Sequence, residues 1–132
     1  MSGENVEALR AVYEEWGNGN FRAGVDLYDP DVVFVQGAGF PESGAYHGRE
    51  GIREYMRTFL ETWTRLSIKA DDFLEAGDTV VAEVIQRGAG RESAAPGEFR
   101  YFHVWSFRGR KVIRLEAIRD RADALEAAGL TE

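Results

Sequence analysis

Apolar side chains recur every three or four positions near the start of the chain, which is the spacing of one face of a helix. The first such face carries Val6, Leu9, Tyr13 and Trp16, and residues 17–20 follow with glycines and asparagines that end helices. A longer helix is predicted over residues 50–64, with the apolar face Ile52, Tyr55, Met56, Phe59, Leu60 and Trp63. Shorter helices are predicted over residues 21–28 and 121–128.

The apolar period changes to two in the second half of the chain, which indicates strands. We predict strands over residues 32–36, 66–74, 79–87, 99–107 and 111–118. Glycine-rich stretches at residues 37–48 and 88–98 are predicted to be loops. About three helices and a run of antiparallel strands predict an α+β domain, with the helices packed on one face of a curved sheet.

The strand over residues 99–107 carries a candidate site. One of its faces presents His103 in a row of four aromatic side chains, and the other face is also mostly apolar. Such a strand is expected at the centre of the sheet, covered by helices on one side and by a partner on the other. His103 is either a hydrogen-bonded core histidine or a residue that acts on a ligand, with a pKa lowered by burial in both cases. The other histidine, His47, is expected in a solvated loop.

Composition limits the classes of function. The chain has 132 residues, no cysteine and a formal charge of −7, so we expect one domain over residues 1–132, without disulfides and without a nucleic-acid or membrane partner. Neither histidine has further ligands at metal-binding spacing, and no nucleotide-binding or serine-hydrolase motif is present. We therefore expect no metal and no cofactor. The amino-terminal segment lacks the basic head and apolar run of a secretion signal, so we expect a cytoplasmic protein.

The order of several short segments resembles a known family. These segments are residues 13–21 (YEEWGNGNF), 28–34 (YDPDVVF), 46–53 (YHGREGIR), 103–107 (HVWSF), 109–114 (GRKVIR) and 120–130 (DRADALEAAGL). Together they resemble the SnoaL-like domains of the nuclear-transport-factor-2-like superfamily, which also includes ketosteroid isomerase. The resemblance implies a cystatin-like cone, in which a curved antiparallel sheet wraps around the helices and encloses an apolar pocket. It also implies a homodimer through the outer face of the sheet.

The resemblance also suggests site residues. His103 matches the histidine of the polyketide cyclases and the oxyanion-binding aspartic acid of ketosteroid isomerase. The cyclases' catalytic aspartate falls near Ala117, and the isomerase's general base falls at Gln36, so neither position holds a carboxylate here. The isomerase's oxyanion tyrosine falls at or beside Val12, next to Tyr13.

The candidate catalytic residues are therefore His103, as acid or base, with Gln36, Tyr13 and Arg119 orienting the ligand. Arg119 would extend the inward row of the last strand to the pocket mouth; alternatively, it forms a surface salt bridge with Asp120 or Glu116. The residues expected to line the pocket are Trp16, Phe34, Tyr55, Phe59, Trp63, Tyr101, Trp105, Leu115 and Ala117. The aromatic residues among them also serve as core.

Two functions remain open at this stage. One is a cofactor-free isomerase, cyclase or hydrolase that performs acid–base chemistry on a hydrophobic carbonyl or polycyclic compound through His103. The other is a non-catalytic dimeric module that binds a small hydrophobic ligand. A protein-interaction module is a third, weaker alternative. Residues 98–121 hold seven basic and three acidic side chains, and this local charge of +4 is expected to face an acidic surface of a second subunit or a carboxylate-bearing ligand.

Overall fold

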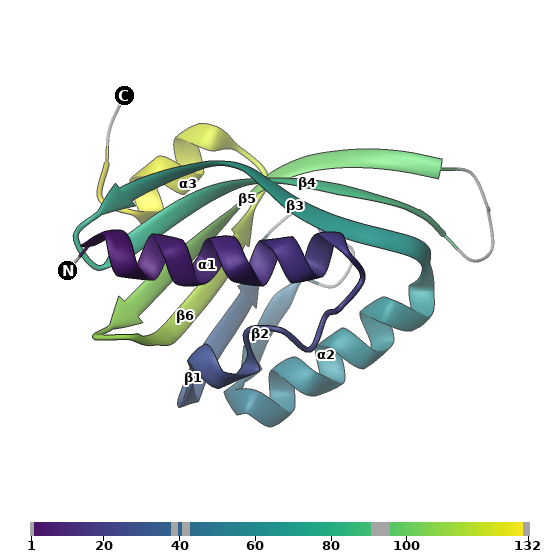
Figure 1. The fold of residues 1–132 in the computed structure, drawn as a ribbon, viewed down its shortest axis with the longest axis horizontal. Helices are drawn as coiled ribbons and strands as arrows, with labels where there is room; N and C mark the ends of the chain where they lie inside the picture. The colour runs from purple at the N-terminus through teal and green to yellow at the C-terminus, as the bar shows by residue number, and fades with distance from the viewer. Residues whose placement is uncertain (1, 38–39, 41–42, 91–95, 131–132) are drawn as a thin grey trace.

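The computed structural model describes residues 2–37, 40, 43–90 and 96–130. Three α-helices, a short 3-10 helix and six strands follow one another along the chain (Figure 1). The helices are α1 (Ser2–Gly17), η1 (Val25–Leu27), α2 (Gly48–Thr62) and α3 (Arg121–Ala127). The strands are β1 (Tyr28–Gln36), β2 (Gly44–His47), β3 (Trp63–Ala76), β4 (Thr79–Gly90), β5 (Pro96–Arg108) and β6 (Lys111–Ile118).

The six strands form one curved sheet in the order β2-β1-β6-β5-β4-β3. All neighbours pair antiparallel except β1 and β6, which run parallel. The predicted fold class, an α+β domain with a curved sheet wrapped around helices, is confirmed, although the sheet is mixed rather than wholly antiparallel. The central place predicted for β5 is also correct, because it pairs with β4 on one side and with β6 on the other.

The curvature of the sheet has a local origin in β3. Its pairing with β4 shifts between Thr64 and Ser67 and again between Ala70 and Asp72. Arg65, inside the first shift, has a positive φ of 50°. Irregularities of this kind bend a strand and increase its twist. The long strands β3 and β4 therefore curve, and they pass above α1 in the view of Figure 1.

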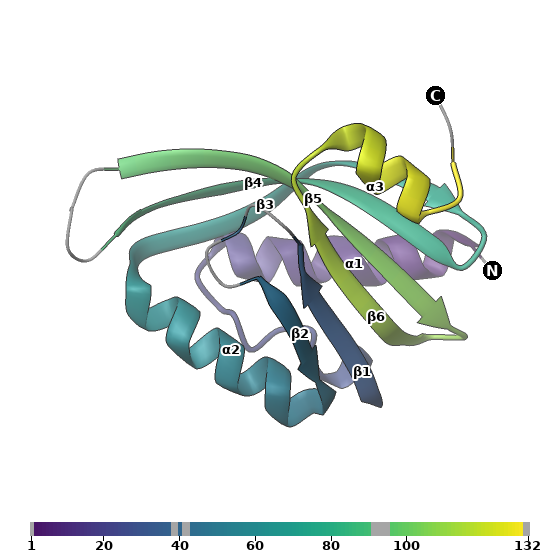
Figure 2. The ribbon, with the colours of Figure 1, turned by 180° about the vertical axis from the view of Figure 1, so that it is seen from behind.

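The helices lie on both faces of the sheet, which corrects the prediction that all of them share one face. Figures 1 and 2 show α1 and α2 on one side and α3 on the other. The reason is a second apolar cluster on the outer face, where Ala124 of α3 packs against Val81 and Val104. The apolar character of that side of β5 is thus partly explained by a helix of the same chain.

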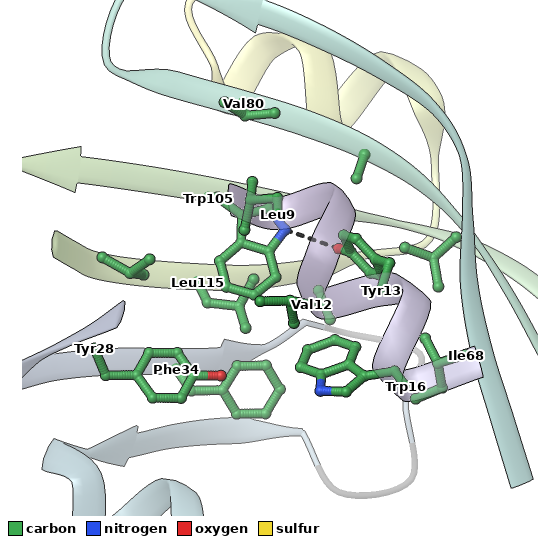
Figure 3. Packing of buried hydrophobic residues seen from close by; sticks show 14 of the residues in the cluster. Leu9, Val12, Tyr13, Trp16, Tyr28, Phe34, Ile68, Val80, Trp105 and Leu115 are labelled. Carbon is green, nitrogen blue, oxygen red and sulfur yellow. Dashed lines mark hydrogen bonds between the residues drawn. The ribbon is translucent and has the colours of Figure 1, made fainter. Parts of the chain in front are cut away.

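The main core lies between α1, α2 and the inner face of the sheet. The stripe predicted on α1 is buried there at Leu9, Tyr13 and Trp16, against Val80 and Trp105 of the sheet (Figure 3). Each of these large side chains contributes about 1.5–3 kcal/mol of hydrophobic free energy when it is fully buried. The apolar side chains that alternate along the strands and those on one face of α1 are therefore buried in the same core layer.

Two local predictions are wrong. The helix predicted over residues 21–28 is a turn followed by the three-residue η1, because the stretch is too short and is interrupted by Gly24, which has a φ of 94°. The loop predicted over residues 37–48 contains β2, which pairs with β1 from Val33 opposite His47 to Gln36 opposite Gly44. The predicted loop over residues 88–98 is shortened by β4 and β5, and its middle lies outside the described residues.

No helix within the described part of the chain is long and apolar enough to cross a membrane.

Candidate functional site

A cavity of about 1430 Å³ has three walls. They are the end of α1 together with the loop after it, the helix α2, and the inner face of the sheet. Seven of the nine residues expected to line a pocket do line it: Trp16, Phe34, Tyr55, Phe59, Trp63, Tyr101 and Leu115. Trp105 and Ala117 are each about 1% exposed and lie in the core, outside the set of lining residues. The aromatic stripe of α2 is thus both core and pocket wall.

His103 lies on the inner face of β5 and contributes to the cavity wall. Its Nδ1 is 2.6 Å from the hydroxyl oxygen of Tyr13 on α1. The same oxygen accepts a hydrogen bond of 2.8 Å from Nε1 of Trp105 (Figure 3). The three side chains are buried, so two residues of β5 and one of α1 form a closed network beside the cavity.

This network determines which nitrogen of His103 carries the proton. Trp105 can only donate, so the Tyr13 oxygen is its acceptor. Burial raises the pKa of Tyr13 well above its ordinary value, so its hydroxyl keeps its proton. Among the described residues, Nδ1 of His103 is the acceptor within hydrogen-bond distance of this hydroxyl. A neutral imidazole that accepts at Nδ1 carries its proton on Nε2.

His103 is neutral at physiological pH. Burial lowers its pKa from 6.5 to about 3, because an imidazolium ion would lose its hydration in this apolar site. The shift corresponds to about 5 kcal/mol against protonation. No described residue forms a hydrogen bond with Nε2. The atom is also not one of the fully buried side-chain atoms that lack a partner, so part of its surface is accessible. Its N–H group is therefore open to the cavity.

Gln36 approaches His103 through the register of the sheet. Gln36 pairs with Ala117 of β6, and Ala117 pairs with His103 of β5, so the three residues form one row. Ala117 is the small residue between the two polar side chains. Nε2 of Gln36 donates to the hydroxyl oxygen of Tyr55 at 3.0 Å, which leaves Oε1 of the amide without a described partner. Gln36 also lines the cavity.

The structure brings three of the four candidate catalytic residues into one region. His103 and Gln36 line the cavity wall, and Tyr13 reaches it through its bond to His103. Arg119 follows β6, is exposed, and lines the cavity at its solvent side. Glu116, one of the two salt-bridge partners considered for Arg119 beside Asp120, pairs with Arg114 at 3.5 Å, and the salt bridge of Arg119 stays a prediction. His47 is exposed at the start of α2 and lies outside the cavity lining.

Charged side chains surround the opening of the cavity unevenly. The described lining includes one carboxylate, Glu98, which pairs with Arg87 at 2.8 Å and with Arg100 at 3.4 Å. The cationic lining residues are Arg22, Arg49, Arg53, Arg57, Arg100 and Arg119. No group of three or more metal-ligating side chains occurs among the described residues. The cavity lining therefore has neutral hydrogen-bonding groups at buried positions and cations at exposed positions.

Gln86 is a lining residue that the sequence analysis missed. It lies on the inner face of β4, in a row with Val80, Ala82 and Val84, and is 5% exposed. An amide in an otherwise apolar inward row is the signal that could have identified it. Tyr101 O–H donates to its Oε1 at 2.7 Å.

Comparisons with known proteins agree with this architecture. Residues 9–115 match a family model described as a SnoaL-like domain. No curated protein matches the sequence.

Similar solved structures cover nearly the whole chain. A putative SnoaL-like polyketide cyclase from Jannaschia has 18% identity, covers 100% of this chain and 96% of its own, and has a TM-score of 0.78. TerC, co-crystallised with polyporic acid, has 23% identity, coverage of 95% and 98%, and a TM-score of 0.77. A hypothetical protein from Catenulispora acidiphila with a ketosteroid isomerase-like fold, in complex with trimethylamine, has 21% identity, coverage of 98% and 95%, and a TM-score of 0.73. At these identities the likeness is one of fold.

Proposed function

Because the chain belongs to the family of SnoaL-like domains, we propose that it binds a small hydrophobic carbonyl compound in its cavity, with the carbonyl oxygen accepting a hydrogen bond from Nε2–H of His103. The observation that carries this proposal is the network of Trp105, Tyr13 and His103, which leaves one nitrogen of a neutral histidine as a donor toward the cavity. Aromatic and aliphatic walls accommodate the rest of the ligand.

The identity of the ligand rests on this chain's own residues. The similar structures were solved with polyporic acid in one case and trimethylamine in another, and these two compounds share no group that would identify a ligand here. A neutral N–H donor suits an uncharged acceptor oxygen, and the buried residues around it are mostly apolar. The ligand class supported best is therefore a ring-bearing ketone or related carbonyl compound.

A second candidate function is catalytic, and the short contact between Tyr13 and His103 favours it. In an acid-catalysed step, Nε2–H of His103 would pass to the ligand oxygen while the phenolic proton of Tyr13 moved to Nδ1. Trp105 Nε1–H would then stabilise the phenolate that remains. Such a step would serve an isomerase, cyclase or hydrolase, and general acid catalysis contributes about 10²–10⁴-fold in rate.

We favour binding without catalysis over the catalytic function for a physical reason. Burial raises the pKa of Tyr13, so formation of its phenolate is costly. The described cavity lining also lacks a buried carboxylate that could remove a proton from carbon. Hydrogen bonding to a carbonyl requires neither group to change its charge.

The test uses a pair of probes that differ in the acceptor alone, para-acetylbiphenyl and para-isopropenylbiphenyl. We expect the purified protein to bind the ketone about tenfold more tightly, since one neutral hydrogen bond contributes about 1–1.5 kcal/mol. The measurement is a fluorescence titration, together with the infrared stretch of the bound carbonyl, which a hydrogen bond lowers.

The variant His103→Phe keeps the aromatic volume and removes the donor, so it should abolish the preference for the ketone. His47→Phe, at an exposed histidine outside the cavity, is the matched control and should keep it. An unchanged preference in His103→Phe would contradict the proposal. Turnover of a carbonyl substrate that is lost in both His103→Phe and Tyr13→Phe would favour the catalytic candidate.

A further inference from the structure

Gln86 is a buried polar lining residue that the proposed function does not use. The residue is 5% exposed, and it lines the same cavity as His103. A buried primary amide has two N–H donors and an acceptor oxygen to satisfy. Leaving a buried donor without a partner costs about 1–3 kcal/mol, so its surroundings indicate what it binds.

The hydrogen bond from Tyr101 fixes the orientation of this amide. Burial raises the pKa of the Tyr101 hydroxyl, which therefore stays protonated and donates to Oε1 of Gln86 at 2.7 Å. Nε2 of the amide then faces away from that bond. No described residue accepts a hydrogen bond from Nε2. Among the described residues, the side-chain atom that is fully buried and has no hydrogen-bond partner is Oε2 of Glu75, so Nε2 of Gln86 is not fully buried. Nε2 of Gln86 is therefore open to the cavity that its residue lines.

The register of the sheet separates Gln86 from His103. His103 lies opposite Ala82, whereas Gln86 lies opposite Phe99, four residues further along β4. At a strand rise of roughly 3.3 Å per residue, the two rows are about 13 Å apart. The stretch between them on the inner face is formed by Val84 and Tyr101, which are both buried. The cavity thus has two separate polar positions along one apolar wall.

We propose that Gln86 is a specificity-determining residue, whose Nε2–H donates to a second acceptor oxygen at the far end of the ligand. The ligand class is then an elongated ring compound with an acceptor oxygen at each end, such as a diketone or a hydroxyketone. This inference rests on the proposed function, because the first oxygen is the one held by His103. Tyr101 acts as a positioning residue that keeps the amide turned toward the ligand.

The test compares para,para′-diacetylbiphenyl with para-acetylbiphenyl, which lacks the second oxygen. We expect the wild-type protein to bind the diketone about tenfold more tightly, again the equivalent of one hydrogen bond. Gln86→Met keeps the length of the side chain and places a weak acceptor near Tyr101, so the fold should be retained. We expect this variant to lose the advantage of the diketone and to bind the monoketone as the wild type does.

A second variant, Gln86→Leu, removes the acceptor as well, and near-ultraviolet circular dichroism reports whether the core of each variant is intact. Equal affinity of the wild type for both ketones, or an equal loss for both in Gln86→Met, would overturn the inference. In either case a ketone preference that His103→Phe abolishes would leave the proposed function standing. A preference for para-acetylbiphenyl over para-isopropenylbiphenyl that His103→Phe retains, together with a diketone advantage that Gln86→Met removes, would instead support the second position and contradict the first.

Discussion

The chemistry of the cavity depends on a single residue whose protonation is determined by its neighbours. His103 was identified from sequence because it interrupts a row of aromatic side chains on one strand. Its partner Tyr13 was named as a candidate, but its bond to His103 joins residues 90 positions apart, which no local pattern reveals. The sequence leaves open a hydrogen-bonded core histidine or one that acts on a ligand, and the structure adds the Tyr13 hydroxyl as its partner and a burial that lowers its pKa.

The buried histidine should make stability depend on pH. Because its folded pKa of about 3 lies below the ordinary value of 6.5, the unfolded chain takes up a proton that the folded chain does not bind. The contribution is fully present above about pH 6.5 and decreases as pH falls toward 3, by about 1.4 kcal/mol per unit. We expect the free energy of unfolding to fall by about 2 kcal/mol from this residue alone between pH 6.5 and 5.

Urea unfolding of the wild type and of His103→Phe across this range measures the effect. Carboxylates contribute to both proteins, so the difference between their pH slopes isolates the histidine. His47→Phe should keep the wild-type slope. Parallel curves for the wild type and His103→Phe would show that this imidazole is protonated as easily in the folded chain as in the unfolded one.

At the scale of the elements, the site depends on how β1 meets β6. The sequence predicts β6 with its observed bounds and the second half of β1, because alternation is a local signal. It missed β2 and the parallel pairing, since neither leaves a local pattern: β2 is four residues long in a glycine-rich stretch, and the partner of β1 is about 80 residues away. Gln36 reaches the row of His103 only through this pairing.

Gly37 permits the close approach of the two strands, and its replacement tests their role. The N–H of Gly37 donates to the carbonyl of Ala117 at 3.0 Å, and a Cβ on Gly37 would stand 2.7 Å from that oxygen. Gly37→Ala must therefore displace backbone, and we expect a loss of about 1–3 kcal/mol in the free energy of unfolding. Ketone affinity should fall as well, because a displaced β1 moves Phe34 and Gln36, which line the cavity.

Gly3→Ala is the matched control, since a Cβ there meets nothing within 4 Å. Denaturation curves for both variants give the comparison. Equal stability of Gly37→Ala and the wild type would mean that β1 and β6 tolerate a wider separation than the hydrogen bond suggests.

At the scale of the whole molecule, the basic segment over residues 98–121 has partners within its own chain. Arg108 pairs with Asp29 at 2.9 Å, Arg110 pairs with Glu4, and Arg114 pairs with Glu116. Arg100 contacts Glu98 and Asp71. The sequence showed the excess charge but could not show these pairs, most of which join distant segments. Much of the segment's charge is thus balanced before any second subunit or ligand is considered.

A homodimer through the outer face of the sheet remains a prediction, and the structure changes its expected character. Leu74, which is 42% exposed, and Ile85 belong to the outward rows of β3 and β4, beside the part that α3 covers. We expect an apolar interface and therefore a dimer that persists in high salt, because salt screens charges and not hydrophobic contacts.

Analytical ultracentrifugation of the wild type at low and high salt measures the mass. Ile85→Lys should yield a monomer, because it places a charge in that interface. Glu14→Lys, at an exposed position of α1, should leave the dimer intact. A monomeric wild type, or a dimer that Ile85→Lys leaves intact, would contradict an interface on this face.

The parallel pairing of β1 with β6 also has a consequence for how the chain acquires its shape. During synthesis, Gln36 leaves the ribosome long before residues 112–117, against which β1 must pair. Contacts of such sequence separation form late, because closing a long loop costs entropy that only the completed sheet can offset. The hairpins that join β3 to β4 and β5 to β6 can assemble first. We expect the wall that carries Phe34 and Gln36 to be added last, so that the cavity is completed only when the rest of the sheet has formed.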